Sequence, residues 1–362
     1  MENERDWSAL QPEMLHLISK KLPDLPNLVR FRVVCQSWRS ASSVSDPPPQ
    51  LPWFIRIELP SIYSKNPDLQ KKYLCFYSMI SGEIPKFKVP VPDSRYKEIK
   101  GCAHRYMLAY DWEKGSLSLL NPLTGREISL PPLKLCWWEL LCIRSDPSPS
   151  GVFVAIYGVD RPGHIILASC RVGDSNWVTV EQSNMKTNCC QTYFKGMFYV
   201  HDQDTRITEV IDATTGGIVH LIQPQEYPTA KYRNAEWSFD FFVESGGDLL
   251  GISGIGLYDN NPNEYCFEIH RLDEGNGNPR WVPMKSVGDR FLFLHNLSGV
   301  SYNASDFPGL KGNTIYFLSS ARNMSYLAFF ASYLVNFDIE RGTTERLEWA
   351  ADVDTWFLPG LP

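Results

Sequence analysis

The sequence predicts a small all-α module at the N-terminus followed by a large all-β body. Apolar residues recur at helical spacing up to about residue 45. The chain beyond Pro47 consists instead of short alternating patterns separated by Gly, Asn, Asp and Pro, which is typical of strands and turns. One strand–turn–strand unit also recurs in this second part. We therefore expect a helical module over residues 1–45, a proline-rich spacer over 46–52 and a β domain over 53–362.

The first predicted helix begins at Pro12, a residue that suits the first helical turn because its missing N–H needs no partner there. Glu13 favours the positive end of the helix dipole, and Pro23 ends the helix. The apolar residues of this segment follow three- and four-residue spacing: Met14, Leu15, Leu17, Ile18 and Leu22.

A second helix is predicted after Pro26, with Asn27 as its N-cap, and a third short one around Trp38. Three helices in about 40 residues cannot bury so many apolar groups among themselves. The module must either pack on the β body or bind a partner chain. The stiff Pro47-Pro48-Pro49 spacer favours the partner.

The β body contains a repeated unit of an apolar strand, a polar turn that ends in Gly, and a second strand. Four clear copies have their turns at Gly82, Gly125, Gly216 and Gly342, and two weaker copies at Gly173 and Gly275. The spacing is close to the ~40–50 residues of a four-stranded propeller blade. The sequence therefore predicts a six-bladed β-propeller.

Charge and composition exclude several functional classes. The net charge of −6 divides into about +1 up to Ser45 and −7 beyond it, and no basic stripe is present, so nucleic acid is not an expected partner. No apolar run is long enough to cross a membrane and no signal peptide is recognisable. Nine scattered cysteines then indicate reduced thiols, and we expect an intracellular location in the nucleus, the cytoplasm or both.

The N-terminal segments WSALQPEMLHLI and LVRFRVVCQSW resemble an F-box, whose usual pattern is Leu-Pro-x-Glu-Leu-Leu followed by Leu-x-Arg and Val-Cys-x-x-Trp. Gln11 departs from the pattern, where plant members usually carry Pro. The resemblance implies binding to a Skp1-like adaptor and, through it, to a cullin in an SCF ubiquitin ligase. Carried over by position, the adaptor-binding residues would be Leu10, Pro12, Leu15, Val29, Val34, Cys35 and Trp38. Some of these residues would instead hold the three helices together.

The β body resembles the propeller domain of the KIB-type family of plant F-box proteins. The resemblance rests on NPLTGREISLPPL, MKSVGDRFLFL, DFPGLKGNTIYF and DTWFLPGLP. His295 and Thr314 depart from it, where Gly and Cys are common. It implies a target-binding propeller that carries no active site.

No catalytic, cofactor or metal site is recognisable from the residues themselves. The glycine-rich segment 251–256 is not followed by a helix, as a phosphate cradle requires. Cys189 and Cys190 are adjacent rather than spaced for zinc, and one of them is expected in the core. His201-Asp202 is explained better by a surface turn than by acid–base catalysis.

Four aromatic residues are candidates for a target-binding face, because interfaces favour Trp and Tyr. They are Trp137, Trp138, Trp237 and Tyr258. The competing explanation is that tryptophans pack between blades.

These observations favour a substrate-recognition subunit of an SCF-type E3 ubiquitin ligase that catalyses nothing itself. An alternative is an F-box interaction protein that does not lead to degradation. A propeller enzyme is a third hypothesis, and it would require a cluster of acids and histidines on inner strands.

Overall fold

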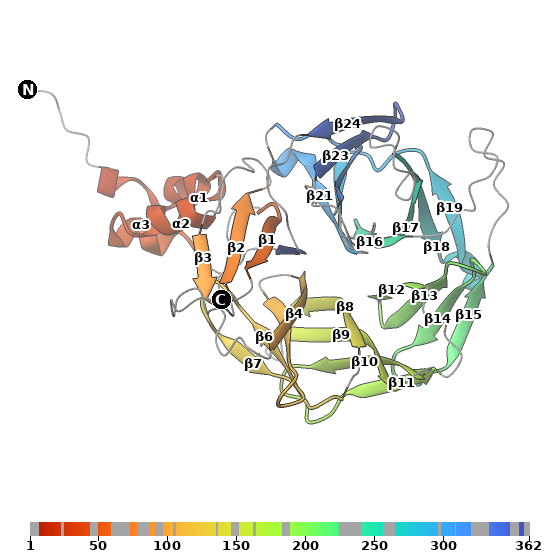
Figure 1. Ribbon diagram of the computed structural model, residues 1–362. Coiled ribbons are helices and arrows are strands. Elements are labelled where there is room, and N and C mark those ends of the chain that lie inside the picture. The colour runs from red at the N-terminus through yellow and green to blue at the C-terminus, as the bar shows by residue number, and fades with distance from the viewer. Residues whose placement is uncertain are drawn as a thin grey trace, which may run out of the picture.

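The computed structural model places a helical module at one side of a ring of β-sheets (Figure 1). The part of the chain that it describes comprises residues 7–22, 25–43, 50–58, 73–78, 87–90, 97–103, 106–134, 137–145, 152–161, 164–182, 189–223, 240–255, 265–295, 298–307, 309–319, 333–347 and 355–357. The prediction of a small helical N-terminus followed by a propeller is confirmed.

The helical module contains three α-helices, as predicted, preceded by a single 3-10 turn. These are η1 (Trp7–Ala9), α1 (Pro12–Lys20), α2 (Leu25–Arg32) and α3 (Gln36–Ala41). The prediction of Asn27 as an N-cap is wrong, because α2 begins two residues earlier. Pro26 is tolerated in the first turn, where no intrahelical N–H bond is lost, and Asn27 instead accepts a hydrogen bond from Arg30 Nη1 at 3.3 Å.

The described strands form five sheets, four of which contain four described strands each, following one another from the centre of the ring outward. The first sheet holds β25 (Thr355–Phe357), β1 (Trp53–Glu58), β2 (Tyr73–Ser78) and β3 (Phe87–Pro90). The second holds β4 (Lys97–Ala103), β5 (Tyr106–Asp111), β6 (Ser116–Leu120) and β7 (Glu127–Ser129). The third holds β8 (Trp137–Ser145), β9 (Val152–Arg161), β10 (His164–Arg171) and β11 (Val178–Gln182). The fourth holds β12 (Cys189–Phe194), β13 (Met197–Asp202), β14 (Thr208–Asp212) and β15 (Ile218–Ile222).

The fifth sheet has nine strands. In spatial order they are β19 (Arg280–Met284), β18 (Cys266–Asp273), β17 (Asp248–Ile255), β16 (Phe241–Ser245), β21 (Ser298–Asn303), β20 (Arg290–His295), β22 (Thr314–Ser319), β23 (Tyr333–Asp338) and β24 (Thr343–Leu347).

The prediction of six blades is wrong, because the described strands form five sheets. The last two repeats of the sequence are joined into one sheet. β21 pairs with β16 in parallel, Phe242 opposite Ser298, and β20 pairs in parallel with β22. A count of turn glycines cannot detect this bridge, because it connects strands that belong to different repeats.

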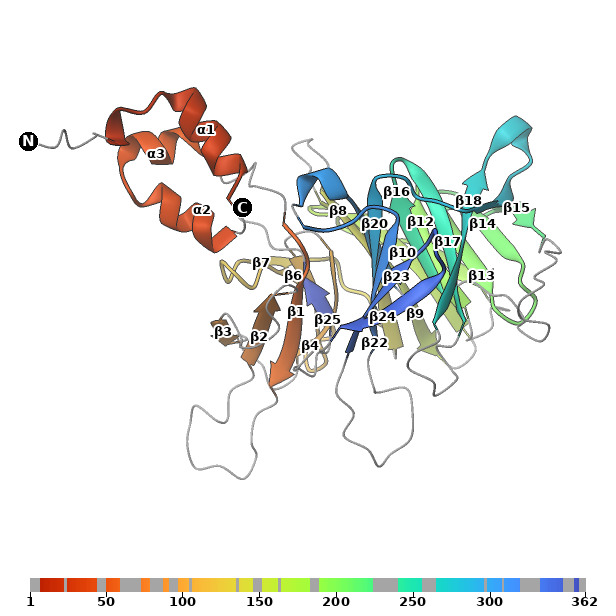
Figure 2. The same ribbon diagram turned by 90° about the horizontal axis from the view of Figure 1, so that it is seen from above.

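The ring is closed by strands from the two ends of the β body. β25 pairs antiparallel with β1, with Trp53 opposite Phe357. The first sheet therefore takes one strand from near the C-terminus and three from the start of the β body. Along the ring, β25, β4, β8, β12 and β16 are successive neighbours, so these are the inner strands (Figures 1 and 2).

A repeated turn explains the periodicity seen in the sequence. In five hairpin turns an Asp or Asn carbonyl accepts a hydrogen bond of 2.7–2.9 Å from the N–H four residues later. The side-chain oxygen of the same residue accepts further backbone N–H bonds inside the turn. The fifth residue has a positive φ, which favours Gly. The pairs are Asp111 and Gly115, Asn121 and Gly125, Asp202 and Arg206, Asp212 and Gly216, and Asp338 and Gly342.

The weaker copies of the repeat behave differently from one another. Gly173 has a positive φ, as its turn position predicts. In the other weak copy the positive φ belongs to Gly277 and not to Gly275. The turn at Gly82, which belongs to one of the four clear copies, lies outside the described residues.

Two tryptophans at equivalent places in the repeat join neighbouring blades. Trp177 Nε1 donates to the Pro131 carbonyl at 2.7 Å, and Trp281 Nε1 donates to Thr208 Oγ1 at 3.1 Å. Both indoles are buried. Each tryptophan thus combines apolar burial with a satisfied N–H at the seam between two sheets.

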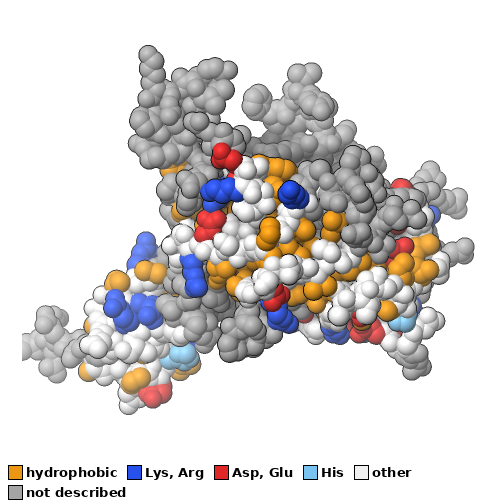
Figure 3. Space-filling model, turned by 90° about the horizontal axis from the view of Figure 1, so that it is seen from below, with side chains coloured by type: hydrophobic (Ala, Val, Ile, Leu, Met, Phe, Trp, Pro, Cys, Tyr) orange, Lys and Arg blue, Asp and Glu red, His pale blue; other side chains and the backbone are white. Residues whose placement is uncertain are grey.

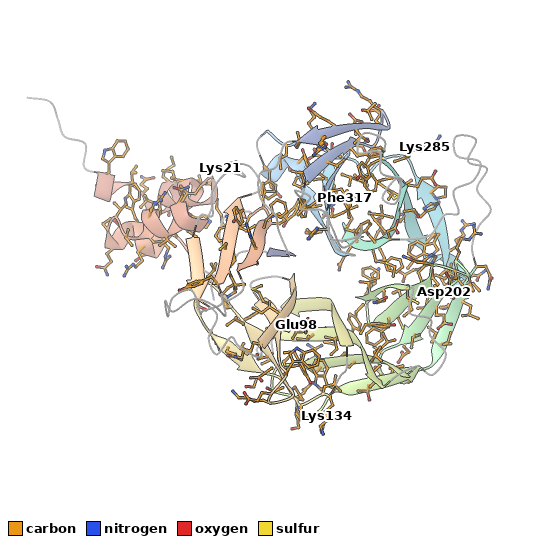
Figure 4. The ribbon with its side chains drawn as sticks, in the orientation of Figure 1. Lys21, Glu98, Lys134, Asp202, Lys285 and Phe317 are labelled. Carbon is orange, nitrogen blue, oxygen red and sulfur yellow. The ribbon has the colours of Figure 1, made fainter. Side chains whose placement is uncertain are left out.

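The helical module is anchored to the propeller through one side chain of α2. Leu28 is 1% exposed and belongs to a cluster with residues from β1, β2, β4, β5 and β6, among them Trp53, Phe76 and Met107. Leu22, just after α1, packs against the same cluster. The module therefore lies against the seam between the first two sheets, and Figure 4 shows Lys21 on the side of the module that faces the ring.

Candidate interaction surfaces

Helix α1 turns an apolar stripe toward solvent. Met14, Leu17 and Ile18 are exposed, and their three- and four-residue spacing places them on one face of the helix. The opposite face carries Leu15 and Ser19, which are buried. A surface helix normally exposes its polar side, so this stripe indicates a surface that a partner covers.

Helix α2 and the residues after it expose a second apolar group. Val29, Val33 and Val34 are 45%, 66% and 58% exposed, and Trp7 of η1 is exposed as well. Val29 directly follows Leu28 in the chain. Leu28 packs on the propeller, whereas Val29 points to solvent. We call the exposed set Trp7, Met14, Leu17, Ile18, Val29, Val33 and Val34 the module apolar surface.

Contacts between the helices hold this surface in place. Arg32 of α2 donates to the carbonyl of Arg39 at 3.0 Å and also to the carbonyl of Ser42. His16 Nδ1 lies 3.3 Å from the carbonyl of Ala41 and so connects α1 to the end of α3. The short helices are therefore stabilised by tertiary contacts, as helices of this length require.

Trp38 completes the module. Its ring packs 4.4 Å from that of Phe31, and its Nε1 donates to the Trp7 carbonyl at 3.0 Å. Trp38 is half-buried, so one side of it holds η1, α2 and α3 together and the rest faces solvent.

The described part of the module has more basic than acidic side chains, although residues 1–45 as a whole have a net charge of about +1. Among the described residues 7–22 and 25–43 the only acidic side chain is Glu13, against five basic ones: Lys20, Lys21, Arg30, Arg32 and Arg39. In Figure 3 Lys and Arg side chains lie beside hydrophobic ones on the helical module. A partner with an apolar patch bordered by acidic groups would match this surface.

The residues predicted to bind an adaptor occupy three kinds of environment. Pro12, Val29 and Val34 are exposed, and Leu10, Cys35 and Trp38 are half-buried. Leu15 is 0% exposed. A direct partner contact predicted for Leu15 therefore does not fit its position, and its role is to pack the helices together.

Sequence reasoning missed Trp7, Met14, Leu17, Ile18 and Val33 as surface residues. The helical spacing placed Met14, Leu15, Leu17 and Ile18 in one broad stripe. The structure divides this stripe into the buried Leu15 and an exposed remainder. Ser19, four residues after Leu15, is buried on the same side, and its Oγ donates to the His16 carbonyl at 2.7 Å.

The structure describes two of the four aromatic residues predicted to bind a target. Trp137 and Trp138 begin the inner strand β8, where they are opposite Val159 and Gly158 of β9. Their backbone is thus at the inner ring of the propeller. Trp237 and Tyr258 lie outside the described residues.

The groups considered for chemistry have structural roles. Residues 251–255 run within strand β17, where Gly254 N–H donates to Asp240 Oδ2 at 2.7 Å. Cys190 is buried in the core, as predicted for one of the two adjacent cysteines. No group of three or more His, Cys, Asp or Glu side chains in the described chain is arranged to hold a metal ion. None of the described helices is long and apolar enough to cross a membrane.

The predicted surface turn is wrong for His201, which is buried in β13, although Asp202 does begin a turn. His201 and His270 are both buried in the propeller, and this burial makes the stability of the propeller sensitive to acid. Burial lowers the pKa of each ring from 6.5 to about 4, and the Asp202 carboxylate opposes this only partly at His201. The His201 ring bonds Thr208 Oγ1 at 2.9 Å. Below pH 6.5 the unfolded chain binds protons that the folded chain does not, so stability falls as the pH drops from 6.5 toward 4 and the loss levels off below that.

Between pH 7 and pH 5 we expect each of the two histidine rings to lower the free energy of unfolding by about 2 kcal/mol. The measurement is the urea unfolding free energy at both pH values for the wild type and for the His201→Gln/His270→Gln variant. The variant should lose less stability than the wild type over this interval. An equal loss of unfolding free energy in the wild type and the variant would show that the two rings do not contribute to the acid sensitivity.

Comparison with known proteins finds a matching propeller family and relatives from one plant. A family model described as KIB1-4 beta-propeller matches residues 76–335. An F-box/kelch-repeat protein of Arabidopsis thaliana is 25% identical over 370 residues, which cover 91% of this chain and 88% of the relative. An F-box protein of the same plant is 23% identical over 398 residues, which cover 98% and 96%. Among solved structures, TolB from Acinetobacter baumannii aligns with 84% of this chain and 65% of its own, at 11% identity and a TM-score of 0.43.

Proposed function

The chain belongs to the KIB1-4 beta-propeller family, and we propose that it is the substrate-recognition subunit of an SCF-type E3 ubiquitin ligase. In this proposal the helical module binds a Skp1-like adaptor, which connects it to a cullin. The propeller holds the target protein. The chain itself catalyses no step.

The observation that carries the proposal is the module apolar surface. Seven large hydrophobic side chains are exposed on a module of fewer than 40 described residues. The module does not need them for its attachment to the propeller, because Leu28 and Leu22 provide that contact. Its relatives are F-box proteins, and adaptor binding accounts for an exposed surface of this kind.

The attachment of the module to the propeller through Leu28 would fix the position of a bound target relative to the adaptor. A module held by a buried leucine keeps a fixed position against the first two sheets. A target on the propeller would then be held at a defined distance from the ubiquitin donor. The rate gain comes from the high effective concentration of target lysines near the donor.

The proposal is tested by reconstitution with a Skp1-like adaptor and a cullin. The full-length chain should co-purify with both the adaptor and the cullin. A Leu17→Asp/Val34→Asp variant should co-purify with neither, because its two charges would be buried without partners at the adaptor interface. A Val178→Asp variant is the control, since Val178 is an exposed aliphatic residue of β11 on the propeller. Equal recovery of the adaptor with all three proteins would contradict the proposal.

A second measurement separates the ligase from an F-box interaction protein that does not degrade its target. Proximity labelling with the full chain identifies target proteins in plant cells. For a degradative ligase, their lifetime increases with a proteasome inhibitor and with the Leu17→Asp/Val34→Asp variant. Intracellular location, in the nucleus, the cytoplasm or both, forms part of this proposal.

A further inference from the structure

The outer strand of the fourth sheet is exposed on both faces. In β15, Ile218, Val219 and Leu221 are 50%, 45% and 55% exposed, and His220 is exposed too. These three residues are the majority of the large exposed hydrophobics described on the propeller, where the others are Trp112 and Val178. Hydrophobic side chains are visible in Figure 3 at the end of the molecule opposite the helical module.

β15 is also the outer strand that lacks protection against strand pairing. An outer strand presents a row of backbone N–H and C=O groups, and proteins normally guard it with charges, prolines or short length. Among the strands that the structure describes, five of the six outer ones follow this rule. β3 has Lys88 and Pro90, β7 is only three residues long and has Glu127, β11 has Glu181, β19 has Arg280 and Pro283, and β24 has Glu345 and Arg346. β15 reads IVHLI, with neither charged residues nor proline.

The hairpin behind this edge is acidic. Leu221 is opposite Glu209 of β14, and Asp212 begins the turn that leads into β15. Residues 202–223 contain four acidic side chains and a single basic one, Arg206. Figure 4 places Asp202 in the same outer part of the fourth sheet. Burial and, second, the neighbouring Asp202 charge raise the pKa of Glu209. A cation nearby would oppose the repulsion between the Glu209 and Asp202 carboxylates.

We propose that the outer edge of β15 binds an extended basic segment of a partner protein, which adds to the fourth sheet as a further strand. Backbone hydrogen bonds would supply the affinity, as in other strand additions. Cross-strand partners share a face, so a Lys or Arg of the segment on the face of Leu221 would approach Glu209. The alternate, apolar residues of the segment would cover the other face of β15. This site is independent of the helical module and of adaptor binding.

The size of the patch argues against a second copy of this chain as the occupant. Stable protein pairs bury about 800 Å² on each side, far more than three half-exposed aliphatic side chains provide. Two copies would also bring their acidic hairpins together, which is unfavourable. A basic segment has the opposite charge and needs only one strand of contact.

The test uses the full-length chain and a labelled octapeptide of alternating valine and lysine. Fluorescence anisotropy measures its dissociation constant for the wild type, for Leu221→Lys and for Val178→Lys. The two variants add the same charge at side chains of similar exposure on neighbouring outer strands, so general electrostatic attraction changes equally in both. A second octapeptide carries glutamate in place of lysine.

We expect Leu221→Lys to weaken binding of the valine–lysine peptide at least tenfold and Val178→Lys to change it less than twofold. The glutamate peptide should bind at least tenfold more weakly to the wild type. Hydrogen exchange should show peptide-dependent protection in residues 218–222. Equal effects of the two variants, or protection elsewhere, would overturn the proposal. So would a wild-type dimer in sedimentation that Leu221→Lys dissociates, because a second copy would then occupy the edge.

Discussion

Replacing Gly312 with alanine is expected to destabilise the propeller by about 3 kcal/mol. A Cβ atom at this position would lie 2.9 Å from the Asp289 Cα atom and 3.1 Å from its carbonyl carbon. The opposing atoms are backbone, and the backbone there is fixed. The Asp289 carbonyl accepts the Ala304 N–H at 2.8 Å, and the neighbouring Arg290 carbonyl accepts the Asn313 N–H at 2.7 Å.

Gly217→Ala is the matched control for this prediction. Gly217 has no positive φ, and its added Cβ would meet only Thr215 Oγ1 at an ordinary 3.6 Å. We expect it to change stability by less than about 0.5 kcal/mol. Urea unfolding of both variants provides the measurement, and similar free energies for the two would refute the argument from close approach.

Replacing the adjacent residues Leu28 and Val29 is expected to change different properties, stability for Leu28 and adaptor affinity for Val29. Leu28→Ala removes a buried side chain from the cluster that joins the module to the propeller, and should cost about 3 kcal/mol. Val29→Ala removes an exposed side chain and should leave stability within about 0.5 kcal/mol of the wild type. Adaptor affinity should fall for Val29→Ala.

Thermal unfolding and hydrogen exchange distinguish the two roles. In Leu28→Ala, the amides of α2 should exchange faster together with those of β1 and β2, because the cluster spans these elements. Unchanged exchange in β1 and β2 would mean that the module is not anchored through Leu28.

The local features of the fold could be predicted from the sequence because they depend on a few neighbouring residues. The turn at Asp212 and Gly216 is encoded by the aspartate that caps it and the glycine that supplies a positive φ. Pro12 marks the start of α1. Trp177 and Trp281 each lie four residues after a turn glycine of positive φ, Gly173 and Gly277.

The failures concern contacts between distant residues. The parallel contact of β21 with β16 merges two repeats, and no residue near Ser298 signals it. Periodicity likewise identified an apolar stripe on α1 without showing that Leu15 faces inward and Leu17 outward. The alternatives of packing on the β body and binding a partner proved compatible, because Leu28 packs on the propeller while Val29 and Val34 remain exposed.

The central claim is that the module apolar surface binds a Skp1-like adaptor. Its most direct test is the dissociation constant of the full-length chain with a purified adaptor, measured by isothermal titration calorimetry. We expect the wild type to bind, Val29→Asp/Val34→Asp to bind at least 100-fold more weakly, and Val178→Asp to bind within twofold of the wild type. Wild-type affinity in the double variant, or no binding by the wild type, would contradict the claim.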